Sequence, residues 1–235
     1  MYLANLNTFD LDKNKRYTYV ISLGALEQHG PYAPLGTDSF AQDAIIKQVD
    51  QALPDVIFLP TLPFGPSYQH LGFMGTISLK PETLFAILTD IVESLQDNAK
   101  TIFFVSWHGG NKPTMIEFIE KMQSKFAETN LAMITFGDEG TDILAEDLLN
   151  GDVDDHAGNT EVSIMLASKP DISKKPETGS TKDTVDFNWD KRIIELTAYG
   201  IIDSNPEWVA SAEIGHKLIK IYADNLISKI RDFSN

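Results

Sequence analysis

Three short segments of this chain combine carboxylates with imidazoles, the side chains that bind divalent cations through oxygen and nitrogen. They are Glu27-Gln28-His29-Gly30, Trp107-His108-Gly109-Gly110-Asn111 and Asp154-Asp155-His156-Ala157-Gly158-Asn159-Thr160-Glu161. If the first segment stays extended, Glu27 and His29 point to the same side and could reach adjacent metals. The chain has no cysteine, so thiolate ligands and a cysteine nucleophile are excluded and any metal must sit on nitrogen and oxygen.

Two further features favour a cation site. Asp38 lies nine residues after His29, where a helix is predicted to begin. A helix N-terminus stabilises a carboxylate, and the two oxygens of Asp38 could bridge two cations. His108 ends the most apolar predicted strand and is followed by two glycines. That arrangement suits a ligand beside a backbone that passes close to another group.

The third segment depends on how its backbone folds. In an unbroken helix, the side chains of His156 and Glu161 would lie about 140° apart, on different faces. Gly158-Asn159 favours a loop-to-helix junction, which would free both side chains to converge. Each candidate also has an ordinary interpretation, because a single histidine is usually structural and a carboxylate at a helix start is usually a cap. His70 and His216 have weaker cases, and His216 is predicted to be structural within the C-terminal helix.

The hydrophobic pattern predicts the scaffold that must position these segments. Strands are predicted at Tyr17–Leu23, 56–59, 101–107 and 131–136, with a further strand at 192–199. Helices are predicted over 38–53 with Thr37 as its cap, from Pro81, over 113–128, and from Asn205 to about Arg231. This alternation predicts a mostly parallel sheet covered by helices, with 101–107 as a central strand. Sites in such sheets form at the carboxyl ends of the strands, which two of the three segments follow.

Length, composition and charge limit the classes of function. The chain has 235 residues, of which 43% are hydrophobic, and this favours one α/β domain spanning 1–235. Its formal net charge of −15 makes nucleic acid and anionic membranes poor partners. No run of about 18 apolar residues could span a bilayer, and residues 1–16 lack the apolar core of a signal peptide. We therefore predict a cytoplasmic protein without a membrane or nucleic-acid partner.

Taken together, five motifs resemble the creatininase (creatinine amidohydrolase) family. They are GALEQHGPYAPLGTD (24–38), HLGFMGTISL (70–79), WHGGN (107–111), DHAGNTEVSIML (155–166) and NPEWVASAEIG (205–215). They span nearly the whole chain in the family's order. The resemblance implies a three-layer α/β/α sandwich with a mostly parallel central sheet, and a homo-oligomer, with a hexamer as the favoured state.

The resemblance also implies a site and a reaction. Two divalent ions per chain would be held by Glu27, His29, Asp38, His108 and Glu161, with Asp38 bridging. Zinc is the expected metal, with manganese or iron as alternatives. The reaction would be hydrolysis of a non-peptide C–N bond in a small-molecule cyclic amide or formamide by a metal-activated water. His156 matches a histidine that assists proton transfer.

Several residues depart from the family pattern. Creatininase proper has Tyr-Glu after the histidine that aligns with His108, and that glutamate is a ligand. Here Gly109-Gly110 follows, so Glu161 must supply the carboxylate. The aromatic wall near His156 is replaced by Asp-Val-Asp-Asp at 152–155, and Gln69 and Met74 stand where many members carry Glu and Pro. These departures predict amidohydrolase chemistry on a substrate other than creatinine.

Two alternatives stay open. The same metal site could hydrolyse a peptide or a lactone, because the ligands do not distinguish between activated carbonyls. The chain could also be a non-catalytic α/β binding protein whose metal site has decayed. Nucleotide binding and a Ser-His-Asp hydrolase have little support, because neither a G-x-G-x-x-G, a G-x-x-x-x-G-K-[ST] nor a G-x-S-x-G pattern occurs.

Overall fold

The computed structural model describes residues 1–151, 156–177, 180, 182 and 191–234, and its centre is a four-stranded parallel sheet. The strands are β1 (Tyr17–Leu23), β2 (Val56–Phe58), β3 (Ala99–Ser106) and β4 (Asn130–Ile134), in the spatial order β2-β1-β3-β4. β1 and β3 occupy the inner positions, and Leu23 at the end of β1 lies opposite Ser106 at the end of β3. The predicted parallel sheet with a central strand near 101–107 is confirmed.

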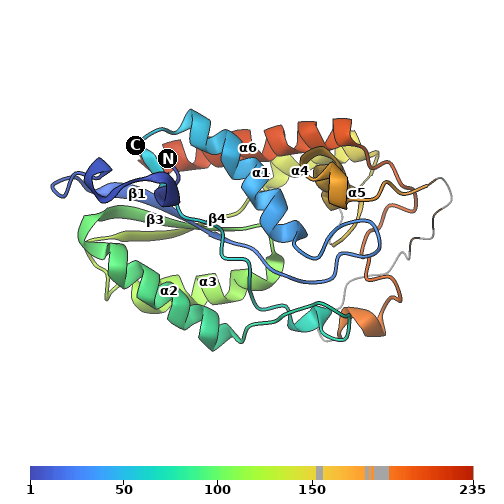
Figure 1. Cartoon of the computed structure of the whole chain (residues 1–235), viewed down its shortest axis with the longest axis horizontal. Coiled ribbons are helices and arrows are strands. Elements are labelled where there is room, and N and C mark those ends of the chain that lie inside the picture. The colour runs from blue at the N-terminus through green and yellow to red at the C-terminus, as the bar shows by residue number, and fades with distance from the viewer. Residues whose placement is uncertain (152–155, 178–179, 181, 183–190, 235) are drawn as a thin grey trace.

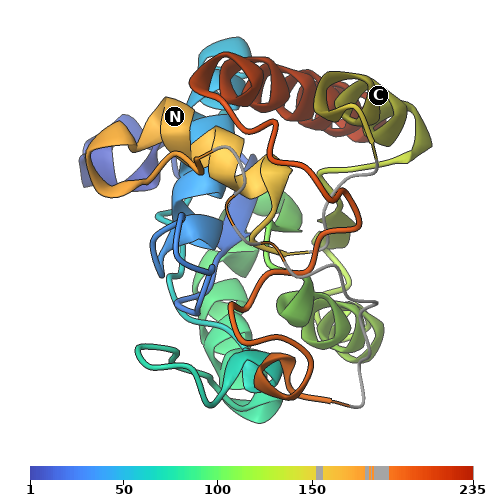
Figure 2. The ribbon, with the colours of Figure 1, turned by 90° about the vertical axis from the view of Figure 1, so that its right-hand side faces the viewer.

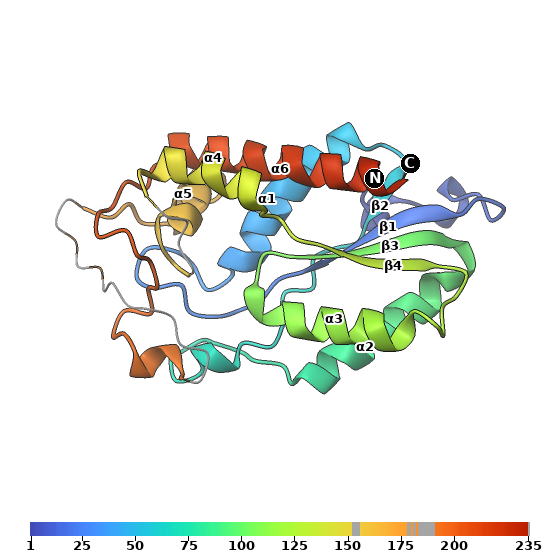
Figure 3. The same cartoon turned by 180° about the vertical axis from the view of Figure 1, so that it is seen from behind.

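Helices cover both faces of this sheet and complete a three-layer α/β/α sandwich (Figure 1). One layer consists of α1 (Thr37–Ala52), α4 (Glu139–Leu149), α5 (Asn159–Ser168) and α6 (Ala212–Ser234). The other consists of α2 (Pro81–Leu95) and α3 (Lys112–Met122), and the view from behind shows the same division (Figure 3). Short 3-10 turns lie at Leu3–Asn5, Thr8–Asp10, Tyr68–His70, Gln96–Asn98, Gly109–Asn111, Pro170–Ile172 and Ile193–Glu195. Among the helices described, none has the length and apolarity needed to cross a bilayer.

Two apolar cores hold the layers together, one on each face of the sheet. Successive residues of a strand point to opposite faces. Val20 and Phe103 therefore pack in the core beneath α1 and α6, whereas Ile21 and Phe104 pack in the core toward α2 and α3. Burial of strands on both faces is typical of parallel sheets. The two cores thus fix the carboxyl ends of β1 and β3 side by side, where the first two polar segments begin.

Two elements predicted in the second half of the chain differ from the structure. Residues 192–199 do not form a strand, and Ile193–Glu195 is a 3-10 turn instead. Its Glu195 carboxylate accepts a hydrogen bond from the Arg192 backbone N–H (2.8 Å), which favours a turn over an extended segment. The final helix begins at Ala212 rather than near Asn205. The Asn205 side chain is used elsewhere, because its amide donates to the Leu149 carbonyl (3.0 Å).

Helix boundaries in the first half need smaller corrections. α1 begins at Thr37, so Gly36 and not Thr37 is its cap. The Thr37 hydroxyl instead donates back to the Pro34 carbonyl (2.6 Å). α3 ends at Met122, short of the predicted 128. α4 was not predicted at all, although Asp138 caps it by accepting a hydrogen bond from the Thr141 backbone N–H (3.0 Å).

Close packing of α5 against α6 gives a testable prediction about stability. A Cβ atom added to Gly215 on α6 would lie 1.9 Å from the Ser163 carbonyl oxygen on α5, so the helices would have to separate. We expect Gly215→Ala to lower the free energy of unfolding by about 1–3 kcal/mol, the usual cost of overpacking. Urea unfolding would measure it. The matched control is Gly140→Ala on α4, where the nearest atom to an added Cβ is 3.7 Å away. Equal stability of the two variants would contradict the prediction.

Candidate metal centre

The carboxylates and imidazoles singled out in the sequence meet at the carboxyl end of the sheet. Glu27 and His29 come from the loop after β1, and His108 follows β3. Asp38 lies in the first turn of α1 and Glu161 in the first turn of α5. All five side chains are buried. Four of them, with His156, line a cavity of about 240 Å³, whose wall also includes Gln69, His70, Trp107, Gly109, Gly110 and Ile193.

Glu27 lies at the centre of a group of imidazoles. Its Oε1 atom is 3.2 Å from His108 Nδ1 and 3.2 Å from His70 Nε2. His156 Nδ1 is 3.8 Å from the same oxygen. A single carboxylate oxygen therefore faces three ring nitrogens, which is an arrangement that a cation or a shared proton can occupy.

Asp38 connects this group to the remaining candidates. Its Oδ2 atom lies 3.6 Å from His29 Nε2 and 3.9 Å from His108 Nδ1. His29 Nε2 lies in turn 3.5 Å from Glu161 Oε2. Three groups of side chains bring one potential ligand atom each within 4.8 Å of one another. These groups are Glu27-Asp38-His108, His29-Asp38-Glu161 and Glu27-His29-His156.

Backbone carbonyls determine which ring nitrogens face this centre. His29 Nδ1 lies 3.1 Å from the Glu27 carbonyl oxygen, and His108 Nε2 lies 2.7 Å from the Pro66 carbonyl oxygen. Because a carbonyl can only accept, each of these nitrogens must carry a hydrogen and donate it. His29 Nε2 and His108 Nδ1 are left to face the carboxylates. An imidazole held in this way by its second nitrogen is typical of metal ligands.

Unsatisfied atoms give an independent indication of a cation. Both oxygens of Glu27, Oδ2 of Asp38 and Nε2 of His29 are buried, and the described part of the chain offers them no hydrogen-bond partner. Buried charged groups without a partner are costly, so they are usually paired or coordinate a metal. Carboxylate oxygen and imidazole nitrogen, without sulfur, suit zinc, manganese and iron. The residues present therefore fit a divalent metal.

The pKa shifts follow from burial and crowding. Burial and the neighbouring charge of Glu27 raise the pKa of Asp38 to about 7. Burial opposes protonation of His29, but the charges of Glu161 and Asp38 outweigh it and raise the pKa of His29 to about 10. Burial is likewise outweighed at His108, where the charge of Glu27 raises the pKa to about 9.

The other two imidazoles shift the opposite way. Burial, with the nearby His156 ring, lowers the pKa of His70 to about 2. Burial, with the positive charge of His29, lowers the pKa of His156 to about 4. Both rings are therefore neutral at physiological pH. A neutral imidazole at the wall of the cavity can accept a proton.

Neighbouring groups hold Glu161 in place. The Trp107 indole N–H donates to Glu161 Oε1 (2.8 Å), and the Ala157 backbone N–H donates to Glu161 Oε2 (2.7 Å). Ala157 has a φ of 58°, a left-handed conformation that costs free energy in a residue with a Cβ. The loop-to-helix junction at Gly158 and Asn159 does occur, and it brings His156 and Glu161 to the same cavity.

His70 belongs to the centre, although its place in the sequence made a weaker case for it. The residue is only 6% exposed and its ring lies against Glu27. It belongs to a 3-10 turn rather than to the end of a strand, so the strand-end argument could not find it. The same turn contributes Gln69 to the cavity, whereas Met74 is 95% exposed. Figure 2 faces this end of the molecule, where the turn at Tyr68–His70 lies beside the turn at Ile193–Glu195.

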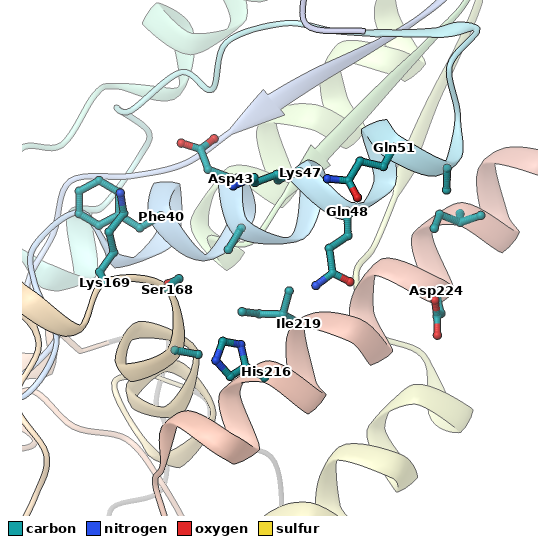
Figure 4. Close-up of a pocket in the computed structure, with 14 residues that line it drawn as sticks. Phe40, Asp43, Lys47, Gln48, Gln51, Ser168, Lys169, His216, Ile219 and Asp224 are labelled. Carbon is teal, nitrogen blue, oxygen red and sulfur yellow. The ribbon is translucent and has the colours of Figure 1, made fainter.

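His216 lies apart from this centre. It is exposed on α6 and lines a separate groove of about 870 Å³, into which Phe40 and Gln48 of α1 also project (Figure 4). None of the candidate metal ligands lines that groove. Asp154 and Asp155 of the third polar segment, and the stretch 152–155 expected to replace an aromatic wall, lie outside the described residues.

Comparisons with known proteins identify relatives of this chain. A family model described as creatinine amidohydrolase matches residues 4–230. A mycofactocin precursor peptide peptidase of Mycobacterium ulcerans is 30% identical over 161 residues, which cover 65% of this chain and 59% of the relative. A creatinine amidohydrolase of Pseudomonas putida is 28% identical over 170 residues, which cover 65% of each protein. The chain thus spans less than two thirds of the length of these relatives.

The fold has solved counterparts as well. A structure described as "Creatininase Mn" superposes with a TM-score of 0.84 and 21% sequence identity, covering 98% of this chain and 97% of the other. At this identity the likeness concerns the fold. It agrees with the arrangement of a parallel sheet between two layers of helices.

Proposed function

Because the chain belongs to the creatininase family, we propose that it is a metal-dependent amidohydrolase with two divalent cations at the carboxyl ends of β1 and β3. Glu27, Asp38 and His108 would hold one cation, and His29, Asp38 and Glu161 the other. The observation that carries this proposal is that Asp38 belongs to both groups, with unsatisfied buried atoms around it. Zinc is the first candidate metal, and the manganese creatininase of the same fold supports manganese as an alternative.

The chemistry follows from the donor set and the cavity. When bound, two such cations lower the pKa of a water molecule toward neutrality and polarise a substrate carbonyl. His156 would take up a proton at Nδ1, the nitrogen that faces Glu27, and return it to the leaving nitrogen. Trp107 would keep the Glu161 carboxylate oriented. Gly109 leaves space for a substrate, because a Cβ atom there would meet no atom of the described residues within 4 Å.

Size and charge support a small substrate without negative charge. The cavity measures about 240 Å³. Its described lining residues include three carboxylates, those of Glu27, Asp38 and Glu161, but no lysine or arginine. Phosphorylated substrates would require cationic side chains. We propose a cyclic amide or a formamide, whose carbonyl carbon is accessible and whose small size fits such a cavity.

A second candidate is hydrolysis of a peptide bond. The supporting observation is the similarity to a protein named a mycofactocin precursor peptide peptidase. The same side chains would act on either carbonyl, so a substrate panel has to distinguish the two reactions. Turnover of cyclic amides and formamides would support the first proposal, whereas turnover confined to peptides would support the second.

Elemental analysis tests the metal proposal directly. Protein purified without chelator or affinity tag is expected to contain about two equivalents of zinc, manganese or iron per chain. Protein that contains none of these metals and takes up none on soaking would contradict the proposal and favour a non-catalytic binding protein.

Proton release on metal binding is a further prediction. His29 and His108 have pKa values near 10 and 9, so at about pH 8 both rings hold a proton that a cation must displace. Below these pKa values protons compete with the cation, and raising the pH through them removes the competition. Zinc affinity should therefore rise with pH. Titration calorimetry in buffers of different ionisation enthalpy should report the release of about two protons, and an enthalpy independent of the buffer would contradict this.

A further inference from the structure

Gln28 stands between Glu27 and His29 in the sequence, and both neighbours are candidate metal ligands. Its side chain contacts two of the imidazoles at the cavity, those of His70 and His156. The residue is 4% exposed. The Gly30 backbone N–H donates to Gln28 Oε1 (3.0 Å), and Gln28 Nε2 donates to the Gly200 carbonyl (2.9 Å). Exchanging the two amide atoms would oppose like groups at both contacts. The backbone therefore fixes the orientation of the amide, with its NH₂ group toward the histidines.

The contacts of this NH₂ group and of the Gln28 backbone carbonyl indicate which nitrogen of each ring carries the hydrogen. Gln28 Nε2 lies 3.2 Å from His70 Nδ1 and 2.9 Å from His156 Nε2, but only one of its hydrogens remains after the bond to Gly200. His156 Nε2 also lies 2.8 Å from the Gln28 backbone carbonyl oxygen, which can only accept. His156 Nε2 must therefore carry a hydrogen and cannot accept one from the amide. The remaining amide hydrogen goes to His70 Nδ1.

The opposite assignment satisfies fewer contacts. If His156 Nε2 were bare, its lone pair would face the Gln28 carbonyl oxygen at 2.8 Å. His70 Nδ1 would then receive no hydrogen from the amide. With the hydrogen on His156 Nε2, one close approach of two N–H groups remains, between Gln28 Nε2 and His156 Nε2 at 2.9 Å.

We propose that Gln28 is a positioning residue for both rings, and that each neutral ring carries its hydrogen on Nε2. The side-chain amide donates to His70 Nδ1, and the backbone carbonyl accepts from His156 Nε2. His156 then presents a bare Nδ1 toward Glu27, at 3.8 Å, where it can accept a proton. His70 presents an N–H toward Glu27 Oε1, at 3.2 Å, and favours the ionised carboxylate. The catalytic use of these tautomers rests on the function proposed above, whereas the tautomers themselves follow from the hydrogen-bond contacts.

Two further contacts hold Gln28 in this position, one with Thr76 and one with Gly200. Its backbone N–H donates to the Thr76 hydroxyl (3.0 Å). Gly200 has a φ of 75°, and a Cβ atom at this position would lie 1.8 Å from Gln28 Oε1. A glycine is therefore required for the amide to reach the Gly200 carbonyl. Contacts with Gly30, Thr76 and Gly200 thus hold Gln28 against the two rings.

Nitrogen NMR of the full chain labelled with ¹⁵N-histidine tests the proposal, with zinc added as a diamagnetic probe cation. The chain has five histidines, so single substitutions can assign their signals. The parent protein should show His70 and His156 protonated at Nε2 and bare at Nδ1. In Gln28→Leu, the chemical shift of the bare His70 Nδ1 should change because this nitrogen loses the hydrogen bond from the amide. His156 should keep its hydrogen on Nε2 because its partner is a backbone carbonyl.

A matched control separates this effect from loss of a buried glutamine. Gln42 is fully buried, and among the described residues its amide bonds to the backbone of Val105 and Trp107. Gln42→Leu should leave the nitrogen signals of His70 and His156 unchanged. We also expect Gln28→Leu to reduce turnover of the best amide substrate by about 10- to 100-fold, the usual effect of removing a residue that hydrogen-bonds to the groups of a metal site. The zinc content should stay at the parent value.

Two results would overturn the proposal. One is a parent spectrum in which His156 or His70 carries its hydrogen on Nδ1. This measurement uses the unsubstituted protein, so it does not depend on whether a variant folds. The other is a His70 Nδ1 signal that is the same in Gln28→Leu as in the parent, because the amide would then not donate to this nitrogen. A protein with the expected tautomers but without bound zinc would contradict only the proposed function, so the two failures can be told apart.

Discussion

Replacing Asp38 with asparagine is expected to remove both cations from the protein while leaving its fold intact. Asparagine has nearly the same shape, but it lacks the negative charge and the second anionic oxygen that a shared ligand needs. Asp38 Oδ2 lies within 4 Å of both His29 and His108, so its loss affects both proposed cation positions. Metal content should fall from about two equivalents toward none, and turnover should fall to that of chelated protein.

The fold should survive this substitution because the charged form of Asp38 is itself unfavourable. Burial and Glu27 raise its pKa to about 7. A raised carboxyl pKa favours the folded state at low pH, and this contribution is lost as the pH rises through about 7. At about pH 8, removal of the charge should therefore not lower the stability of chelated protein, which thermal unfolding can check.

Asp43→Asn is the matched control for this experiment. Asp43 lies on the same helix as Asp38, on its exposed side. The same chemical change there should leave metal content and turnover at parent values. A variant of Asp38 that retained two metals and full turnover would contradict the assignment of Asp38 as a shared ligand.

Replacing His156 with glutamine is expected to reduce turnover by about 100- to 10,000-fold, the range for loss of a positioned proton carrier. Burial and the charge of His29 lower the pKa of His156 to about 4, so the ring is neutral and can accept a proton. Steady-state kinetics on the best substrate of the panel would measure the loss, which should fall on kcat. Metal content should stay at the parent value, because His156 belongs to neither cation group that contains Asp38.

His216→Gln provides the control for His156, since His216 is exposed on α6 and does not line the cavity. It should leave kcat and metal content unchanged. Loss of a metal equivalent in His156→Gln would contradict the proton-transfer role. It would instead favour His156 as a ligand, because Glu27, His29 and His156 can also surround a cation.

The central scaffold could be predicted from local patterns because its signals are local. Tyr17–Leu23 is a run of aromatic and β-branched residues, and it forms β1 with those bounds. Pro81 begins α2 as expected of a proline at the first helical position. The predicted strand at 192–199 was wrong because a local hydrogen bond forms a turn there, whereas the predicted start of the last helix was wrong because of a distant partner. Asn205 is held by Leu149 rather than opening a helix, and no periodicity in 205–231 could indicate this contact.

Motif composition and hydrophobic period are properties of neighbouring residues, so the family, the parallel sheet and the types of ligand available could be predicted from the chain alone. How closely the side chains approach one another depended on the tertiary structure. Glu27 and His108 are distant in sequence, and they come within 3.2 Å because β1 and β3 pair in parallel. His70 joins them from a turn, and Gln28 meets Gly200 from a distant part of the chain. Such contacts depend on how the layers pack, since packing and long-range hydrogen bonds, and not local spacing, fix the position of a side chain.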